Sequence, residues 1–223
     1  MLGTIYLGGG GSPDDELPVW TDMLQGARRI LYWPFALSGD MLEGADAWLR
    51  GNLTGRWPSA HVSTWTTLNG HSTEELADFD ILFIGGGNTF DLLEHVMLHG
   101  FAEPVRRFIA SGGSFYGGSA GAILASDDIG IAEAYDDNKT GLTILEGLGL
   151  TPGATVLPHY GPDEEATGRR WSQKQGITVL GIPERSGLKI SGGQARVLGR
   201  EPIHVIGAAG TTIVRPGELL PAM

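Results

Sequence analysis

The stretch Ser111-Gly-Gly-Ser-Phe-Tyr-Gly-Gly-Ser-Ala-Gly-Ala-Ile-Leu-Ala125 decides how the rest of the chain is interpreted. Residues 114–116 are typical of a strand, and residues 120–125 are typical of the start of a buried helix. Between them, Gly117-Gly-Ser-Ala-Gly121 matches the Gly-x-Ser-x-Gly pattern of a nucleophile elbow, whose glycines relieve the crowding of an abrupt strand-to-helix turn. Such a turn exposes the Ser119 hydroxyl beside the unpaired N–H groups of a helix N-terminus. The alternative is a glycine-rich loop with an incidental serine, which this context disfavours.

The composition is that of an acidic globular chain, with 223 residues, a formal net charge of −11 and 41% hydrophobic residues. We expect one domain spanning residues 1–223, because this length suffices for a substantial core. No basic stripe is visible, which argues against a nucleic-acid partner, and no apolar run is long enough for a membrane span. The first residues lack the pattern of a signal peptide, which favours the cytoplasm. The chain has no cysteine, so any nucleophile must carry oxygen or nitrogen.

Apolar runs alternate with helical patterns over most of the chain. Strands are expected at residues 4–7, 29–33, 61–68, 80–84, 114–116, 155–159 and 177–183, and helices at residues 40–50, 91–98, 101–110, 120–125 and 163–175. Ser72-Thr-Glu-Glu75 is a capping box that opens a further short helix, and Asp40 is the expected N-cap of the helix at 40–50. The alternation predicts an α/β fold with a mainly parallel central sheet. Short β segments after residue 187 predict an antiparallel C-terminal extension.

Glycine-rich turns follow several of the expected strands. The run at residues 8–11 could begin a dinucleotide site, but residues 12–16 place three carboxylates and a proline where a pyrophosphate would bind. The turns at residues 85–87 and 117–121 both lie at strand ends. Because sites in such sheets form at the carboxyl ends of strands, we expect these two turns to face one cleft. Their backbone N–H groups can approach a ligand closely.

A serine nucleophile requires a general base and a third group that orients the base. The candidates for the base are His61, His71, His95, His99, His159 and His204. His159 is favoured because it follows an expected strand and a proline, at the sheet edge where Ser119 is expected.

The acid of such a site falls into one of two groups. Glu133, Asp136 and Asp137 lie between serine and histidine in the sequence, whereas Glu184 follows both and lies at a strand end. Exposed loop acids are usually only solvated, so spacing favours Glu184 slightly. The sequence positions of these residues alone do not decide which carboxylate orients the histidine.

The chain resembles the peptidase E (aspartyl dipeptidase) family, to which the cyanophycinases are related. The motifs that carry the resemblance occur in order between residues 80 and 200: Ile84-Gly-Gly-Gly-Asn-Thr-Phe90, Gly117-Gly-Ser-Ala-Gly-Ala122, Leu157-Pro-His159, Gly181-Ile-Pro-Glu184 and Ser191-Gly-Gly-Gln194. The resemblance implies a fold similar to class I glutamine amidotransferases, with helices on both faces of the sheet. It also implies a Ser-His-Glu triad of Ser119, His159 and Glu184.

The resemblance further implies which groups surround the triad. The backbone N–H groups of Gly87 and Ala120 are expected to bind the oxyanion, and Asn88 is expected to position the substrate. The family has an additional functional aspartate after the serine, and here Glu133, Asp136 or Asp137 takes its place.

These features predict a serine peptidase that hydrolyses short peptides, chiefly dipeptides with an N-terminal aspartate, without a metal or cofactor. A loop acid would pair with the substrate ammonium, and Arg169 or Arg170 with its side-chain carboxylate, unless these arginines only form a solvated helix face. Apart from the peptide substrate, the expected state is a monomer or a homodimer.

Three other functions remain open at this stage. The first is an α/β-hydrolase-type esterase, in which Glu133 or Asp136 would serve His159 in the chain order Ser, acid, His. The second is a ligand-binding domain that kept the turn without catalysis. The third is a cyanophycinase-like hydrolase of acidic peptides.

Overall fold

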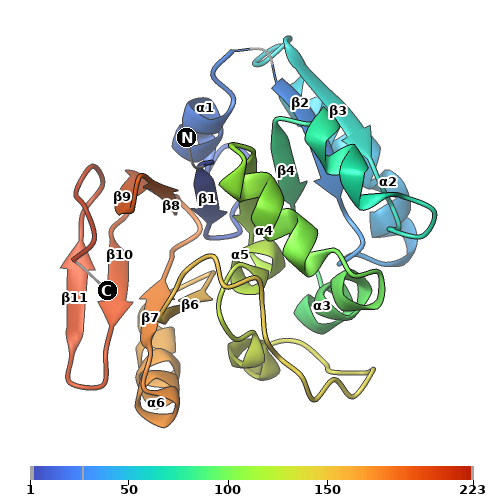
Figure 1. The fold of residues 1–223 in the computed structure, drawn as a ribbon. Helices are drawn as coiled ribbons and strands as arrows, with labels where there is room; N and C mark the ends of the chain where they lie inside the picture. The colour runs from blue at the N-terminus through green and yellow to red at the C-terminus, as the bar shows by residue number, and fades with distance from the viewer. Residues whose placement is uncertain (1–2, 27, 222–223) are drawn as a thin grey trace.

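The computed structural model describes residues 3–26 and 28–221, and it has the α/β architecture expected from the sequence (Figure 1). A seven-stranded sheet has the order β3-β2-β4-β5-β1-β8-β9. Its parallel strands are β1 (Ile5–Gly8), β2 (Arg28–Trp33), β3 (Ala60–Thr64), β4 (Ile81–Ile84) and β5 (Ser114–Gly118). Strands β8 (Ser186–Ser191) and β9 (Gln194–Gly199) extend it in antiparallel pairing. The mainly parallel central sheet is therefore confirmed.

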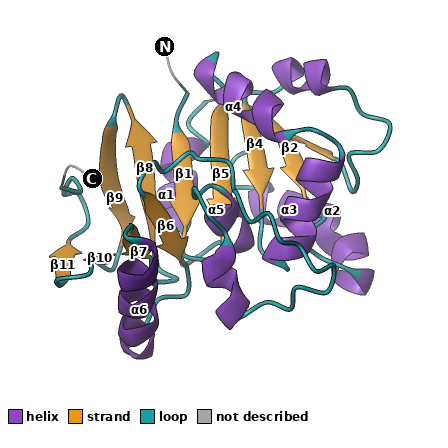
Figure 2. Ribbon diagram, turned by 60° about the horizontal axis from the view of Figure 1, so that its bottom comes forward, coloured by secondary structure: helices purple, strands orange, loops and turns teal. Residues whose placement is uncertain are grey.

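Helices cover both faces of this sheet (Figure 2). The helices on one face are α1 (Leu17–Met23) and α2 (Gly39–Leu53), and those on the other are α3 (Thr89–Leu98), α4 (Ala102–Ala110) and α5 (Ala120–Leu124). Strand β2 shows the reason, because its side chains alternate between two apolar clusters: Ile30 and Tyr32 pack with α1 and α2, and Leu31 and Trp33 with the other helices.

Helix starts follow local capping chemistry, with one correction. The capping box of Ser72 and Glu75 is present and opens the 3-10 helix η1 (Thr73–Asp78). The expectation that Asp40 caps the second helix is wrong, because Ser38 is the N-cap residue and Asp40 lies inside the first turn. A carboxylate in that turn still complements the helix dipole.

A second, four-stranded sheet has the order β11-β10-β7-β6. It consists of β6 (Ala154–Leu157), β7 (Thr178–Gly181), β10 (Ile203–Ile206) and β11 (Thr211–Val214), with α6 (Glu165–Gln175) beside it, preceded by the 3-10 helix η3 (Pro162–Glu164). The strand before His159 was expected to belong to the central sheet and to end at the same carboxyl edge as the strand before Ser119, and its place in that sheet is wrong. Strands β8 and β9 occupy the open edge beside β1, so β6 pairs with β7 instead. The C-terminal β segments accordingly divide between the two sheets.

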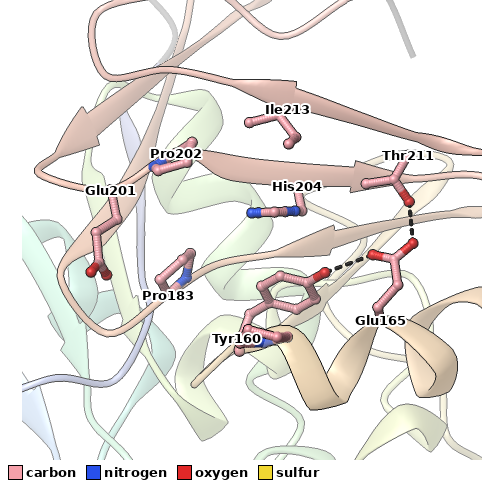
Figure 3. A pocket seen from close by; sticks show the side chains of 10 residues that line it. Tyr160, Glu165, Pro183, Glu201, Pro202, His204, Thr211 and Ile213 are labelled. Atoms are coloured by element: carbon pink, nitrogen blue, oxygen red, sulfur yellow. Dashed lines mark hydrogen bonds between the residues drawn. The ribbon is translucent and has the colours of Figure 1, made fainter.

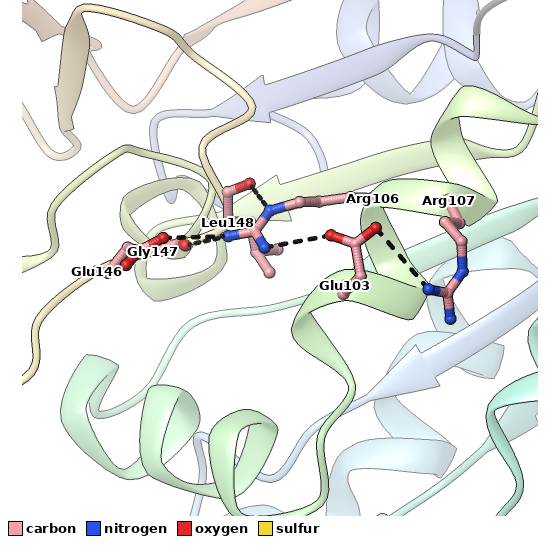
Figure 4. A network of polar contacts seen from close by, with 6 residues as sticks. All are labelled: Glu103, Arg106, Arg107, Glu146, Gly147 and Leu148. Carbon is pink, nitrogen blue, oxygen red and sulfur yellow. Dashed lines mark hydrogen bonds and ion pairs between the residues drawn. The ribbon is translucent and has the colours of Figure 1, made fainter.

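The long segment between α5 and β6 is held down by Arg106 of α4 (Figure 4). Its Nε donates to the carbonyl oxygen of Leu148 at 2.9 Å, and its Nη2 donates to that of Gly147 at 3.1 Å. The same segment contains the 3-10 helix η2 (Gly130–Ala134), after which the chain runs above the start of α3. Arg106 therefore fixes the base of a segment that reaches the sheet's carboxyl edge.

Within residues 3–26 and 28–221, no helix combines the length and the apolar character needed to cross a membrane.

Candidate active site

Ser119 lies on a strained turn between β5 and α5. Its φ of 51° and ψ of −113° are values that residues with a side chain rarely adopt, at a cost of about 1–3 kcal/mol. The flanking glycines are required by space: a Cβ on Gly117 would lie 2.3 Å from the Gly121 carbonyl oxygen, and one on Gly121 would lie 2.4 Å from that of Ile84. The Gly-x-Ser-x-Gly pattern thus describes a turn that passes close against its neighbours and holds the hydroxyl outward.

Three side chains that are distant in the sequence form a hydrogen-bonded row at this turn. The Ser119 Oγ lies 2.9 Å from Nε2 of His159, and Nδ1 of His159 lies 2.9 Å from Oε1 of Glu184. An Nδ1 proton donated to the carboxylate leaves Nε2 as the acceptor for the serine hydroxyl. His159 and Glu184 follow β6 and β7 of the second sheet, whereas Ser119 follows β5 of the central sheet. The row therefore bridges the two sheets.

Two backbone amides beside Ser119 are available to a ligand. Among residues 3–26 and 28–221, the amides of Gly87 and Ala120 have no hydrogen-bond acceptor. Gly87 has a φ of 136°, and a Cβ there would lie 2.2 Å from the Ala36 carbonyl oxygen. The amide of Asn88 donates to that same carbonyl at 2.8 Å, which fixes the loop. Glycine at position 87 is therefore needed for the loop to bring its amide toward the serine turn.

A cavity of about 250 Å³ opens in front of the serine, and it is acidic. Asp136 and Glu164 contribute carboxylates to its lining, together with Tyr135, and no lysine or arginine among the described residues lines it. Asp136 Oδ2 accepts a hydrogen bond from the Thr89 amide at 2.8 Å. The Tyr135 hydroxyl donates to Glu164. Burial, reinforced by this contact with Glu164, raises the pKa of Tyr135, so the phenol stays protonated and remains a donor.

The residues expected to bind substrate are placed differently from one another. Asp136 lines the cavity, but Glu133 is exposed and lies outside the lining. Asn88 also lies outside it and acts as the N-cap of α3: its Oδ1 accepts from the amides of Phe90 and Asp91. Its Nδ2 donates to the backbone of the segment after η2.

The two arginines of α6 differ in their partners. Arg169 pairs with Glu165, which also accepts hydrogen bonds from Tyr160 and Thr211 (Figure 3). This cluster belongs to a separate cavity of about 550 Å³ on the second sheet, which includes none of the three residues of the row. Arg170 is exposed and near enough to Tyr135 to lower that residue's pKa slightly against the larger effects of burial and Glu164. Its Nη2 donates to the Thr167 hydroxyl at 3.2 Å. Of the two arginines, Arg170 is thus the one with an effect on a residue that lines the acidic cavity.

The glycine run after β1 forms part of the site, which sequence reasoning missed. The Gly9 carbonyl accepts a hydrogen bond from the His159 amide at 2.8 Å. A Cβ on Gly10 would lie 2.6 Å from the His159 ring and 2.9 Å from the Ser119 Cβ. Beneath this loop Glu16 is 1% exposed, and its carboxyl accepts from the Gly10 amide at 2.7 Å and from the Tyr116 hydroxyl. Burial raises the pKa of Glu16 to about 7.

Tyr135 and Glu164 were also missed as cavity residues. The only signal for Glu164 was its position five residues after the histidine, and Tyr135 stood next to a candidate acid. Neither position belongs to a periodic pattern that would predict a contact between the two residues. Their side chains come together only because the loops that carry them fold against each other. For metal binding, no cluster of three or more suitable side chains exists among the described residues.

A serine on a strand-to-helix turn of a mainly parallel sheet, hydrogen-bonded to an imidazole, is an arrangement of hydrolytic enzymes. Comparison with known proteins defines the class further. The sequence model described as Peptidase family S51 matches residues 5–198 of this chain. The chain therefore belongs to this family and is a peptidase, which confirms the resemblance seen in its motifs.

Two relatives agree with this membership, and a solved structure shares the fold. Peptidase E of Citrobacter koseri is 28% identical over 210 residues, covering 87% of each chain. Peptidase E of Streptomyces coelicolor is 28% identical over 204 residues, covering 86% of this chain and 80% of the relative. The crystal structure of a peptidase from an acI-B1 Actinobacterium superimposes with a TM-score of 0.75 at 20% identity, covering 99% and 97% of the two chains. This last likeness supports the fold alone.

Proposed function

We propose that this protein is a serine peptidase that hydrolyses dipeptides with an N-terminal aspartate through an acyl-enzyme intermediate. The observation that carries the proposal is the row from the Ser119 hydroxyl through His159 to Glu184, with 2.9 Å between neighbouring polar atoms. A hydroxyl is a weak nucleophile unless a base takes its proton, and this geometry supplies the base and the group that orients it.

In the first half of the reaction, the Ser119 oxygen attacks the peptide carbonyl carbon and its proton passes to Nε2 of His159. The displaced electron pair of the carbonyl forms an oxyanion, which the amides of Gly87 and Ala120 stabilise. One such donor is worth about 3–4 kcal/mol in comparable sites. The C–N bond then breaks, and the amine leaves with the proton from Nε2. The product is an ester between the aspartyl residue and Ser119.

In the second half, water attacks the ester and loses its proton to the same imidazole. The oxyanion forms again, and Ser119 leaves as its hydroxyl after it regains a proton from Nε2. Glu184 holds the imidazole in the required tautomer and stabilises its charged form. No step in this sequence requires an electron carrier.

The acidic cavity supports a free N-terminus as the second recognition element. An ammonium group is stabilised by nearby carboxylates, and Asp136 and Glu164 both line this cavity. A partly solvated pair of carboxylates distinguishes a free amine from an acylated one without any further contact. The substrate aspartate carries a negative charge as well, and we assign its recognition to Arg170, whose charge acts on Tyr135 of this cavity.

Two measurements test the proposal. A serine-directed phosphonate should label wild-type protein at Ser119 and leave Ser119→Ala unlabelled. In a panel of Asp-X, Glu-X, Asn-X and Ala-X dipeptides and longer acidic peptides, Asp-X should have the highest kcat/KM, and Ser119→Ala should retain less than about a thousandth of it. Full activity in Ser119→Ala would disprove the mechanism. A preference for long acidic peptides would contradict the proposed dipeptide substrate but leave the mechanism intact.

The esterase alternative differs from the proposed peptidase in which carboxylate orients His159. If Glu184 orients His159, Glu184→Gln should lower kcat by a factor of roughly a hundred or more, by analogy with the loss of a triad acid. Asp136→Asn should then act mainly on KM. The reverse pattern would identify Asp136 as the acid and overturn the assignment of Glu184.

A further inference from the structure

A second cavity lies on the other side of the glycine turn from the acidic cavity, and it is apolar. Its volume is about 410 Å³, and its side-chain walls come from β2, the loop after it and α2: Tyr32, Leu37, Met41, Ala45 and Trp48. The backbone of Gly85 and Gly86 closes its inner end. We call this cavity the α2 groove.

The α2 groove ends at the glycine turn that lies beside Ser119. A Cβ placed on Gly86 would lie 3.3 Å from the Ser119 Cβ and 3.6 Å from its Oγ, so only backbone stands between the groove and the hydroxyl. The next residue, Gly87, lines the acidic cavity. Neighbouring residues of one glycine turn, 86 and 87, therefore line the two cavities.

The walls of the α2 groove are unusually open to solvent for apolar side chains. Met41 is 65% exposed and Trp48 is 45% exposed, although both belong to a helix whose other face is buried in the core. The ionisable groups among the lining residues are the Asp40 carboxyl and the Tyr32 phenol, and burial raises the pKa of Tyr32, which stays neutral. The groove thus offers apolar contact where the opposite cavity offers negative charge.

We propose that the α2 groove binds the side chain of the residue that follows the scissile bond and selects apolar residues there. This inference rests on the proposed function. If the ammonium of a dipeptide lies between Asp136 and Glu164, the second residue must extend from Ser119 away from the acidic cavity. On that side the backbone of the glycine turn alone separates Ser119 from the α2 groove. Burial of a leucine or phenylalanine side chain against Met41 and Trp48 removes apolar surface from water, whereas glycine gains nothing from the groove.

The wild-type enzyme should therefore discriminate among Asp-X dipeptides by the second residue. We expect kcat/KM for Asp-Leu and Asp-Phe to exceed that for Asp-Gly by roughly tenfold or more, a typical gain for side-chain contacts in an apolar pocket. Asp-Lys serves as the opposing probe, because Asp40 lies at the groove. A preference for Asp-Lys over Asp-Leu would mean that charge governs this position and would overturn the inference.

Two glycines of α2 allow a matched test. Gly44 lines the groove and Gly51 does not, and a Cβ on either meets no atom within 4 Å. Both substitutions to leucine should favour the helix, because glycine is about 1 kcal/mol less favourable than alanine at such positions. Gly44→Leu fills the groove and should lower the Asp-Leu to Asp-Gly ratio of kcat/KM by about fivefold or more. Gly51→Leu should retain the wild-type ratio.

The outcomes separate the two proposals. If wild-type protein hydrolyses Asp-Gly and Asp-Leu at equal kcat/KM, or if Gly44→Leu keeps the wild-type ratio, the groove is not the binding site while the peptidase function stands. If no dipeptide is hydrolysed, both proposals fail. Trp48→Ala is a second test, which removes a side chain from the groove instead of adding one. It should lower kcat/KM for Asp-Phe more than for Asp-Gly. Equal losses would contradict the inference.

Discussion

The backbone amide of His159 donates a hydrogen bond to the carbonyl oxygen of Gly9 at 2.8 Å. His159 follows the second sheet, and Gly9 follows the first strand of the central sheet. The same histidine has a φ of 51°, a strained value that the loop contact helps to hold. The alignment of the imidazole with Ser119 therefore depends on a loop more than a hundred residues away in the sequence.

Gly10→Ala should remove activity with a modest loss of stability. A Cβ at this position would enter the space of the His159 ring and of Ser119, at 2.6 and 2.9 Å. We expect kcat/KM to fall by about a hundredfold or more, because a displacement of the base by about 1 Å costs that much. The matched control is Gly26→Ala, which has nearly the same φ (83° against 88°) but no atom within 4 Å of the added Cβ. Equal activities of the two variants would contradict a role for Gly10 in the site.

Glu16→Gln should change how stability depends on pH. Burial raises the pKa of Glu16 to about 7 in the folded protein, against 4.5 in the unfolded chain. The folded state therefore holds the proton more tightly, and its stabilisation decreases as the pH rises from about 4.5 through about 7, by about 3 kcal/mol in total. The variant cannot titrate. The free energy of unfolding of wild type minus that of Glu16→Gln, from urea curves, should fall by this amount between pH 4.5 and 8. A constant difference would contradict it.

Glu164→Gln should weaken binding of peptides with a free N-terminus. The substitution removes one of two carboxylates from the acidic cavity and keeps a group that can accept from Tyr135. We expect KM to rise roughly fivefold with little change in kcat, since loss of one partly exposed charge contact is worth about 1 kcal/mol. Glu133→Gln is the matched control, because it makes the same charge change on an exposed residue outside the cavity. Similar KM values for the two variants would disprove a specific role for Glu164.

Arg106→Ala should release the segment between α5 and β6. It removes two hydrogen bonds to the Gly147 and Leu148 carbonyls from a side chain that is 34% exposed. We expect a loss of about 1–2 kcal/mol in the free energy of unfolding and a higher KM, because the same segment carries Asp136. Its neighbour Arg107 is 64% exposed, and among the described residues its guanidinium forms an ion pair only with Glu103, at 3.8 Å. Arg107→Ala should change stability by less than about 0.5 kcal/mol. Equal effects would show that Arg106 does not anchor the segment.

Much of the local structure could be predicted from the sequence. Ser72 and Glu75 form the expected capping box, and the continuous apolar run at 81–84 forms a buried parallel strand. These predictions depend on neighbouring residues alone. Helix α1 (Leu17–Met23) was not predicted, and it follows a proline and an acidic run. The helix is stabilised by the burial of Val19 and Trp20 against the sheet, a tertiary contact that its short sequence does not indicate.

The sheet arrangement was less predictable than its strands. A buried apolar strand such as β6 carries no mark of the strand it will pair with, because its backbone groups are the same along either edge. The choice depends on β8 and β9, which follow later in the chain and take the edge beside β1. Prediction of the site residues met the same limit: the resemblance implied that Asn88 positions the substrate, and only the fold shows that its side chain caps α3.

The sequence by itself determined the family, the α/β class and the strained serine turn, because these follow from motifs whose residues lie next to one another and act over a few ångströms. Only the tertiary structure decided that His159 and Glu184 reach Ser119 from a second sheet, and that Gly10, Tyr135 and Glu164 surround it. Those positions depend on which strand edges pair and how long loops close over them. Packing of the whole chain determines both.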